Sequence, residues 1–347
     1  MPTLVFGGDI APIRDDCRDL LGEVAPLIRG ADLAVANLEI ALTDKGLPTR
    51  GKGIVHTGPP ASIPALIEAG FDCMNMANNH VLDYGEDALL DGLARLAKAG
   101  LPVFGAGQNL MTAAAPLILE VKGLKIGLLG YTSTLPQGFA ATATAPGVNP
   151  LRARTAWRAG RNPDEYPGTA PVIDTWPVAE DLARMCADIR ATKACADLVL
   201  VYQHWGCSMT EHVLDFQRAI GHAAIEAGAA GVFGGHQHVV SGVEFHNGAP
   251  IVHGMGNLVF DIFAPFLTEV THRTFLFKAE MSKAGLENCE IIPCRAGVTG
   301  LYDKPVVLPP TEGLGKRIVD TVARLSQPLG TTVAVKGGRV MLERCQV

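Results

Sequence analysis

The sequence predicts an α/β fold in which short strands alternate with helices. Up to Gly235, apolar runs that end in Gly, Asn or His alternate with amphipathic helical patterns, which is the rhythm of β-α-β units. The 347 residues are enough to bury a large core in one or two domains. Hydrophobic residues make up 48% of the chain and charged residues 18%, and the glycines and prolines are spread out, which is typical of a globular enzyme-like protein.

The predicted strands are short apolar runs bounded by turn residues. They comprise residues 4–6, 33–36, 71–76, 103–104, 126–129, 198–202 and 231–233. Amphipathic patterns predict helices at 59–69, 86–99, 177–193 and 212–227, and Gly100 and Gly228 supply the left-handed residue after the second and fourth. After Gly235 strands follow without helices, with hairpin signals at Asn247-Gly248 and Lys283-Ala284-Gly285.

Residues 136–176 interrupt this rhythm because they are rich in Pro, Gly, Ala, Thr and Arg without an apolar period. A loop of this length in a compact domain is usually functional or disordered, and we interpret it as a substrate-side insertion. The chain from about Glu312 predicts one helix and a hairpin at Gly337-Gly338, too little for an independent domain. We therefore expect a catalytic domain at 1–310 and a C-terminal extension at 311–347 packed on it.

The charge and the apolar pattern exclude several classes of partner. A net charge of −6 and a pI near 5.9 disfavour nucleic acid. No export signal is visible, and no apolar run reaches the roughly 20 residues that span a bilayer, so we expect a soluble, cytoplasmic chain without a membrane partner. Eight cysteines without a C-x-x-C pair indicate reduced thiols. A homo-oligomer remains open.

Five segments place metal-ligating side chains at or just after predicted strands. They are Gly8-Asp9, Asn37-Leu38-Glu39, Asn78-Asn79-His80, His204-Trp205-Gly206 and Gly235-His236-Gln237-His238. Loops after parallel strands meet at one edge of an open α/β sheet, where ligands bind. Carboxylate, carboxamide and imidazole ligands suit one or two ions of Mn, Zn, Fe or Ni, and Glu39 could bridge a pair.

Each motif alone has a simpler explanation. Asp9 could cap a turn, Asn78-Asn79 could be left-handed turn residues, and His80 a surface histidine. His236-x-His238 is stronger, because two histidines two apart on an extended segment point to one side. His204 could instead be a core histidine beside a packed Trp205. Five such coincidences at strand ends make the simpler explanations weak.

The motifs resemble the CapA-type (poly-γ-glutamate capsule biosynthesis) family of the calcineurin-like metallophosphoesterases, over roughly residues 3–262. The matching segments are Gly8-Asp9-Ile10, Ala36 to Glu39, Asn78-Asn79-His80-x-x-Asp83-Tyr84-Gly85, His204-Trp205-Gly206, Gly234 to Val239 and His253 to Phe260. The resemblance implies a four-layer α/β/β/α sandwich of the metallo-dependent phosphatase type. It places the metal ligands at Asp9, Glu39, Asn79, His204, His236 and His238.

The same resemblance places the catalytic histidine at His80, with Asp83 beside it. Asn37, Asn78, His253 and Asn257 lie in the matching segments and are expected to contact substrate. Two departures are visible: Ala11 stands where the broader phosphoesterase pattern has a histidine, and Cys207 and Ser208 follow His204-Trp205-Gly206 where an acid is frequent, the next acid being Glu211.

Other polar residues could shape the pocket. Arg152, Arg154, Arg158 and Arg161 form a basic cluster in the insertion that could clamp a carboxylate or phosphate, or could be a solvated loop face. Tyr131 follows the strand at 126–129 and is either a substrate contact or a core residue.

The predicted function is a metal-dependent hydrolase, acting through a metal-activated water on a small anionic, carboxylate-bearing substrate. The motifs do not decide between a phosphoester and an amide or peptide-like bond; Ala11 and the basic insertion favour the amide slightly. Two alternatives are a metal-dependent epimerase or isomerase that moves a Cα proton, and a non-catalytic protein of capsule or poly-γ-glutamate assembly.

Overall fold

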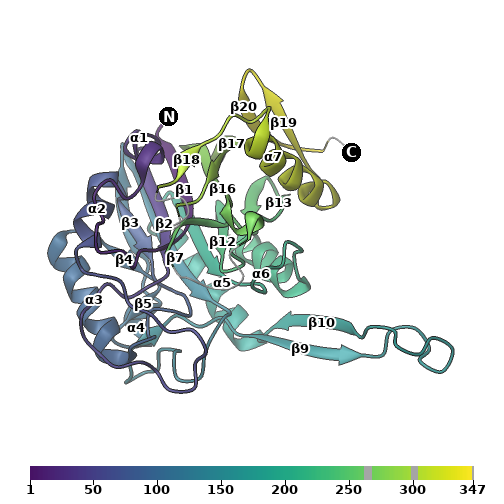
Figure 1. The fold of residues 1–347 in the computed structure, drawn as a ribbon, viewed down its shortest axis with the longest axis horizontal. Helices are drawn as coiled ribbons and strands as arrows, with labels where there is room; N and C mark the ends of the chain where they lie inside the picture. The colour runs from purple at the N-terminus through teal and green to yellow at the C-terminus, as the bar shows by residue number, and fades with distance from the viewer. Residues whose placement is uncertain (262–267, 298–303, 346–347) are drawn as a thin grey trace.

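The protein is described by a computed structural model that covers residues 1–261, 268–297 and 304–345. Figure 1 shows a mixed α/β body built around two large sheets, from which a two-stranded arm extends. The predicted α/β class is therefore confirmed. In these residues no helix is both long and apolar enough to cross a membrane.

The larger sheet has ten strands, and its N-terminal half is parallel. Its order is β19-β20-β17-β16-β1-β2-β3-β4, with β15 beside β1 and β18 beside β17. The strands are β1 (Thr3–Ala11), β2 (Leu33–Leu38), β3 (Cys73–Asn75), β4 (Val103–Phe104), β15 (Asn257–Phe260), β16 (Arg273–Ser282), β17 (Gly285–Arg295), β18 (Val306–Val307), β19 (Thr331–Lys336) and β20 (Arg339–Arg344).

The second sheet has six strands in the order β13-β14-β12-β11-β7-β6. They are β6 (Leu117–Val121), β7 (Leu124–Thr132), β11 (Leu198–His204), β12 (Gly231–Gly235), β13 (Val243–His246) and β14 (Ala249–Val252). Two small antiparallel sheets pair β5 (Ala106–Gly107) with β8 (Gly147–Val148) and β9 (Ala153–Arg158) with β10 (Val172–Pro177).

The two large sheets pack face to face. Side chains alternate between the two faces of each strand, so one set of residues faces the other sheet and the next set faces the helices. Leu4 and Phe6 of β1 share one core with Leu200 of β11 and Phe233 of β12, and the rings of Phe6 and Phe233 stack at 3.8 Å. Val5, the residue between, belongs to a different core with the helices on the outer face.

Helices cover the outer face of each sheet. On the ten-stranded sheet these are α1 (Ala25–Arg29), α2 (Ser62–Ala69) and α3 (Gly85–Ala99), and on the six-stranded sheet α5 (Ala179–Lys193) and α6 (Asp215–Glu226). The remaining helical segments are α4 (Leu110–Ala113), α7 (Gly313–Ser326), η1 (Gly22–Val24), η2 (Glu269–His272) and η3 (Gln327–Leu329). The order of layers is helix, sheet, sheet, helix.

Local sequence signals located most turns correctly. Gly100 and Gly228 have φ of 77° and 114°, as expected for residues that end helices in left-handed geometry. Asn247 and Gly248 have φ of 47° and 93° in the β13–β14 turn, a pair of left-handed residues that suits a tight hairpin. The hairpin at Gly285 joins β16 to β17, and Gly337-Gly338 joins β19 to β20. Because β20 pairs with β17, the C-terminal hairpin extends the ten-stranded sheet.

The interpretation of 136–176 as structureless was wrong. This segment contains β8, β9 and most of β10, and the last two form the arm. Both faces of the arm are largely exposed, so neither strand carries the alternating apolar pattern that a half-buried strand requires. The predicted strands were also too short in places: β1 and β11 continue through Asp9 and His204, which lie within these strands rather than after them.

Candidate metal centre

The predicted ligands meet where the carboxyl ends of strands from both sheets face each other. Asp9 lies in β1, and Glu39 follows β2 by one residue. His204 ends β11, and His236 follows β12. The prediction of one sheet edge is therefore corrected: the cluster combines the edges of two packed sheets.

Asp9 is a buried carboxylate that accepts hydrogen bonds on both oxygens. Oδ1 accepts from Asn37 Nδ2 at 2.9 Å and from the Tyr202 hydroxyl at 3.2 Å, while Oδ2 accepts from the backbone N–H of His236 at 3.0 Å. A Cβ added to Gly235 would lie 2.0 Å from the Tyr202 hydroxyl oxygen and 2.5 Å from Asp9 Oδ1. Only glycine therefore allows β12 to approach Asp9 this closely.

Glu39 lies at the centre of the cluster and has no exposed surface. Neither carboxylate oxygen has a hydrogen-bond partner among the described residues. Three imidazoles face it instead: Nε2 of His204, His238 and His80 lie 3.3, 3.9 and 4.0 Å from Oε1. Burial, followed by the charge of Asp9, raises the pKa of Glu39 well above its ordinary value.

His204 connects the two sheets across the site. Its Nε2 lies 2.7 Å from Asn79 Oδ1, and its Nδ1 lies 3.3 Å from Asn37 Nδ2. Burial lowers the pKa of His204 to about 4, so the ring is neutral at pH 7, which is the form that binds metals. The neighbouring Trp205 is the packed residue, because its indole N–H donates to the carbonyl of His253 at 2.9 Å.

The two histidines of the His236-x-His238 motif do not lie on an extended segment, contrary to the prediction. Their φ angles are 91° and 57°, in the left-handed region that side chains other than glycine seldom adopt. Both rings nevertheless have a ligand nitrogen near Glu39, within 4.8 Å of the other group atoms. His238 Nδ1 lies 2.9 Å from Asn257 Oδ1, and donation along this contact leaves Nε2 directed at Glu39.

His80 forms a second polar group with Asp83, adjoining the ligands. Its Nδ1 lies 2.7 Å from Asp83 Oδ2, while Nε2 faces Glu39. Lys52, which the sequence did not single out, donates to the Asn79 carbonyl at 2.7 Å and forms an ion pair with Asp83. Burial, then the charge of Lys52, lowers the pKa of His80 to about 2.

His56 was also missed and stacks on His80 with ring centroids 4.4 Å apart. Its backbone N–H donates to Asp83 Oδ2 at 3.1 Å, while both ring nitrogens are buried without a hydrogen-bond partner among the described residues. Lys52 and His56 come from the loop between β2 and α2, where no strand end marks them. Tyr202 could have been found, because it lies two residues before His204 and so on the same face of β11.

The asparagines that were expected to contact substrate form an internal scaffold. Asn37 Oδ1 accepts from Asn75 at 2.8 Å and from Asn78 at 3.1 Å, and Asn78 also donates to the carbonyl of Leu38 at 2.8 Å. All three carboxamides are fully buried. In this arrangement they support the loops that hold Asp9 and Asn79.

Two further predicted contacts lie outside the cluster. Tyr131 belongs to the core under α5, where its hydroxyl donates to Asp188 at 3.0 Å. His253 is fully buried, and its Nε2 lies 3.3 Å from Glu244. Both side chains are therefore held by contacts inside the core, away from the ligand cluster.

The predicted arginine clamp is dispersed along the arm and its base. Arg152 binds Asp181 of α5 through two hydrogen bonds of 2.7 Å, and Arg158 pairs with Asp174 at 2.8 Å. Arg161 lies over the ring of Tyr166, 5.0 Å from its centroid. Figure 1 shows that the arm extends away from the body, so these side chains do not converge with the metal ligands.

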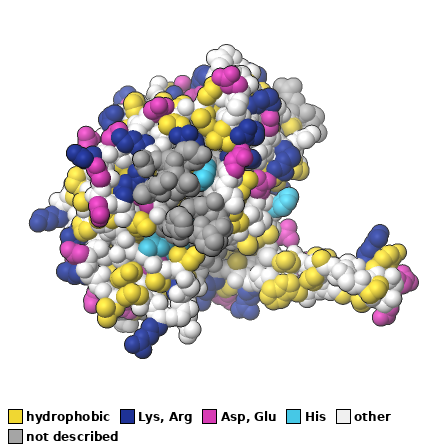
Figure 2. All heavy atoms as spheres, viewed as in Figure 1, with side chains coloured by type: hydrophobic (Ala, Val, Ile, Leu, Met, Phe, Trp, Pro, Cys, Tyr) yellow, Lys and Arg dark blue, Asp and Glu magenta, His cyan; other side chains and the backbone are white. Residues whose placement is uncertain are grey.

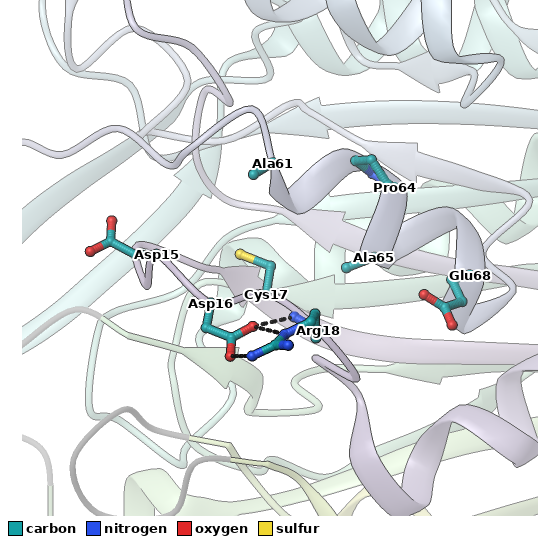
Figure 3. A pocket seen from close by; sticks show the side chains of 8 residues that line it. All are labelled: Asp15, Asp16, Cys17, Arg18, Ala61, Pro64, Ala65 and Glu68. Atoms are coloured by element: carbon teal, nitrogen blue, oxygen red, sulfur yellow. Dashed lines mark hydrogen bonds and ion pairs between the residues drawn. The ribbon is translucent and has the colours of Figure 1, made fainter.

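The surface hollow drawn in Figure 3 is separate from the cluster. It is lined by Asp15, Asp16, Cys17, Arg18, Ala61, Pro64, Ala65 and Glu68, none of which is a predicted site residue. Arg18 and Asp16 pair with each other across it at 2.7 Å. Its charged side chains are exposed to solvent, and Arg18 neutralises Asp16. The hollow therefore lacks the buried charge that the ligand cluster has.

The residues of the cluster fit a divalent metal. Glu39 joins Asp9 and His204 in one group of close ligand atoms, and joins His236 and His238 in another. A fully buried carboxylate without hydrogen bonds is costly unless a cation pairs with it. His236 Nδ1 is likewise buried without a partner among the described residues. The donor set of imidazole, carboxylate and carboxamide would suit divalent ions such as Mn, Zn, Fe or Ni, and Glu39 belongs to both groups.

Comparisons with known proteins found a matching family and related sequences. A family model described as "Bacterial capsule synthesis protein PGA_cap" matches residues 3–262. The PGA biosynthesis protein CapA of Bacillus subtilis (strain 168) is 32% identical over 240 residues, 69% of this chain and 56% of that protein. The capsule biosynthesis protein CapA of Bacillus anthracis is 29% identical over 241 residues, 69% of this chain and 53% of that protein.

The chain thus spans about half the length of these curated relatives. A solved structure of a hypothetical protein from Thermus thermophilus has a TM-score of 0.47 and 16% identity, covering 84% of this chain and 98% of that chain.

Proposed function

We propose, from the premise that this chain belongs to the bacterial capsule synthesis protein family PGA_cap, that it is a metal-dependent hydrolase of a small anionic substrate. The order of its layers is compatible with the four-layer sandwich of metallo-dependent phosphatases, and we assign it to that type. Two of its relatives are named for PGA or capsule biosynthesis, so we place the substrate in that chemistry.

The observation that carries this proposal is the environment of Glu39. Its carboxylate is fully buried, has no hydrogen-bond partner among the described residues, and faces three imidazole nitrogens at 3.3 to 4.0 Å. A structural carboxylate in a core is instead satisfied by hydrogen-bonding groups, as Glu244 is by Arg218, His222 and His253. A cation-binding site explains why the donors are absent.

The assigned ligands are Asp9, Glu39, Asn79, His204, His236 and His238. When bound, a divalent cation supplies Lewis acidity, which acidifies water and polarises a phosphoryl or acyl oxygen. Tyr202 and Asn37 hold Asp9 in place, and Asn257 holds His238, so that the ligands are preorganised before the ion binds.

His80 is assigned the proton transfers. Asp83 accepts from Nδ1 and thereby directs Nε2 towards the ligand cluster. Lys52 neutralises the charge of Asp83, and the low pKa of His80 leaves Nε2 unprotonated and free to accept a proton at pH 7. Nε2 takes the proton that the attacking water gives up and passes it to the leaving group.

We favour an amide or peptide-like bond in a carboxylate-bearing substrate over a phosphoester. Ala11 removes one imidazole from the pattern typical of phosphoesterases. Lys52, the cation beside His80, already pairs with Asp83, which leaves little positive charge there for a highly charged phosphate.

Elemental analysis of the purified protein, combined with turnover assays, tests the proposal. We expect one or two equivalents of metal per chain and metal-dependent cleavage of γ-glutamyl-p-nitroanilide, with slower cleavage of p-nitrophenyl phosphate. Deuterium incorporation at Cα without cleavage would instead indicate an epimerase. A metal-free, inactive protein would indicate a non-catalytic role in capsule or poly-γ-glutamate assembly.

A further inference from the structure

A further group of ligand atoms adjoins the metal centre, and we call it the His56 group. It consists of His56, His80 and Asp83, each of which offers one ligand atom within 4.8 Å of the others. Two imidazoles and one carboxylate are a common donor set for zinc and for non-haem iron. Both ring nitrogens of His56 are buried without a hydrogen-bond partner among the described residues. By its donors alone, the His56 group could hold a further ion.

The ammonium of Lys52 lies within this group. Nζ forms an ion pair with Asp83 and lies 3.0 Å from His80 Nδ1. It also donates to the Asn79 carbonyl at 2.7 Å, which fixes its position. Lysine and arginine side chains are spread over the surface in Figure 2, whereas the side chain of Lys52 is only 14% exposed. The positive charge is therefore held against two of the three residues of the group.

This ammonium and a metal ion would compete for the same carboxylate. Asp83 has no exposed surface, and its Oδ2 accepts from His80 Nδ1 and from the backbone N–H of His56. Its Oδ1 pairs with Lys52. An ion that bound here would have to displace Nζ, or lie close beside a like charge in a buried setting where repulsion is weakly screened.

We propose that Lys52 excludes metal ions from the His56 group by serving there as a built-in cation. One consequence, for His80, rests on the proposed function. A neutral imidazole has one lone pair on its ring nitrogens, so an ion bound at Nδ1 would leave the proton on Nε2. Nε2, which faces Glu39, could then not accept a proton. Lys52 is thus a positioning residue that keeps His80 a base beside the metal centre.

The first test counts the zinc ions in the full chain after equilibration with Zn²⁺ alone. Lys52→Met keeps the length of the side chain without its charge, and we expect it to bind one zinc ion per chain more than wild type. Lys52→Arg retains the charge and should match wild type. Lys52→Gln should also gain one ion, and its amide can still donate to the Asn79 carbonyl, which preserves the loop. Neutral variants that fold and gain no zinc would overturn the proposal.

His56→Phe supplies the matched control. Phenylalanine can keep the stack on His80, whose ring centroid lies 4.4 Å from that of His56, but it has no ligand nitrogen. Combined with Lys52→Met it should abolish the additional zinc, and alone it should leave the zinc content of wild type unchanged. Loss of zinc from the single variant would mean that the group already holds an ion beside Lys52, which contradicts the exclusion.

The second test follows the proton on His80 by nitrogen NMR of the histidine side chains. Zn²⁺ added to Lys52→Met should move this proton to Nε2, while the same addition to wild type should leave it on Nδ1. A His80 signal that zinc does not change in the variant would refute the positioning role. Neither measurement requires turnover, so an inactive wild-type protein would contradict the proposed hydrolase and not the exclusion of metal by Lys52.

Discussion

At the scale of single residues, Glu39 makes the stability of the protein depend on the bound metal ion. Glu39→Gln keeps the shape of the side chain but removes a buried carboxyl group with a raised pKa, which without metal must either bear a charge that has no hydrogen bonds among the described residues or take up a proton. We expect the variant to lose metal binding and, in metal-free protein, to be more stable than wild type by roughly 1 to 3 kcal/mol. Urea denaturation after chelation measures this difference. A metal-free variant that is less stable than wild type would mean that Glu39 has a hidden structural partner.

We assign proton transfer, and not metal binding, to His80, which lies with His56 and Asp83 in a further group of close ligand atoms. We expect His80→Ala to lower turnover by roughly two to four orders of magnitude, the usual contribution of general acid–base catalysis, with metal content nearly unchanged. His246→Ala serves as the control, because His246 lies on the surface strand β13 and pairs with Glu226. Loss of metal from the His80 variant would reassign this residue as a ligand.

The site residues fell into two groups according to how the sequence presents them. Asp9, Glu39, His204, His236 and His238 could be predicted because each lies at the end of a strand, and such ends converge. Lys52 and His56 could not be predicted in the same way, because they lie on an irregular loop. Tyr202 was missed although it lies two residues before His204 on the same face of β11. The sequence left open that Tyr131 is a core residue, which the structure bears out, but it contained no signal that His253 is buried in the core.

At the scale of elements, the close approach of β12 to β1 is required for the site. Gly235→Ala would place a Cβ 2.0 Å from the Tyr202 hydroxyl oxygen and 2.5 Å from Asp9 Oδ1. We expect loss of metal and destabilisation by roughly 1 to 3 kcal/mol, with partial recovery when Tyr202→Phe is added. Gly92→Ala in α3 is the control, because its nearest neighbour would lie at 3.6 Å. An equal effect of both substitutions in thermal melts and metal analysis would refute the steric argument.

Helix α6 is fastened to β13 by a buried carboxylate. Glu244 accepts from Arg218 at 2.9 Å, and His222 and His253 lie 2.7 and 3.3 Å from its oxygens. Burial alone would raise the pKa of Glu244, but the hydrogen bonds from His253, Arg218 and His222 lower it well below 4.5. The stability from this group is therefore present above about pH 4.5 and is lost as the pH falls further.

Glu244→Gln should consequently destabilise the protein at pH 7 by roughly 1.5 to 3 kcal/mol. The difference from wild type should shrink as the pH falls below 4.5, because wild type then loses the same contribution. Melting temperatures from pH 3 to 7 measure this, with the exposed Glu312→Gln as control. A difference that is constant across this range would show that Glu244 contributes packing and not charge.

The sequence predicted elements best where they are half-buried. The helices α3 and α5 were located to within two residues because each has one apolar and one polar face. The arm was missed because both of its faces are exposed, and β3 was overextended because its three residues adjoin a buried, irregular segment. The pairing of two separate sheets is a long-range property that no local pattern encodes.

At the scale of the whole molecule, metal binding should raise the free energy of unfolding. An ion that binds only the folded state stabilises it by about 2.7 kcal/mol at one hundred times its dissociation constant. We therefore expect the melting temperature to fall on chelation and to rise again with added Mn or Zn. The Glu39→Gln variant should show neither change. A wild-type melting temperature that is insensitive to chelation would mean that the ions do not reach the cluster.

The position of β1 has a consequence for synthesis on the ribosome. One side of β1 pairs with β2, while the other side pairs with β15 and β16, more than 240 residues later in the chain. At 5–20 residues per second, the nascent chain leaves that side of β1 open for about 10 to 50 seconds. Throughout this interval an unpaired strand edge is available to neighbouring chains on the same message. Efficient production of this protein should therefore depend on chaperones that shield β1 until residue 282 has emerged.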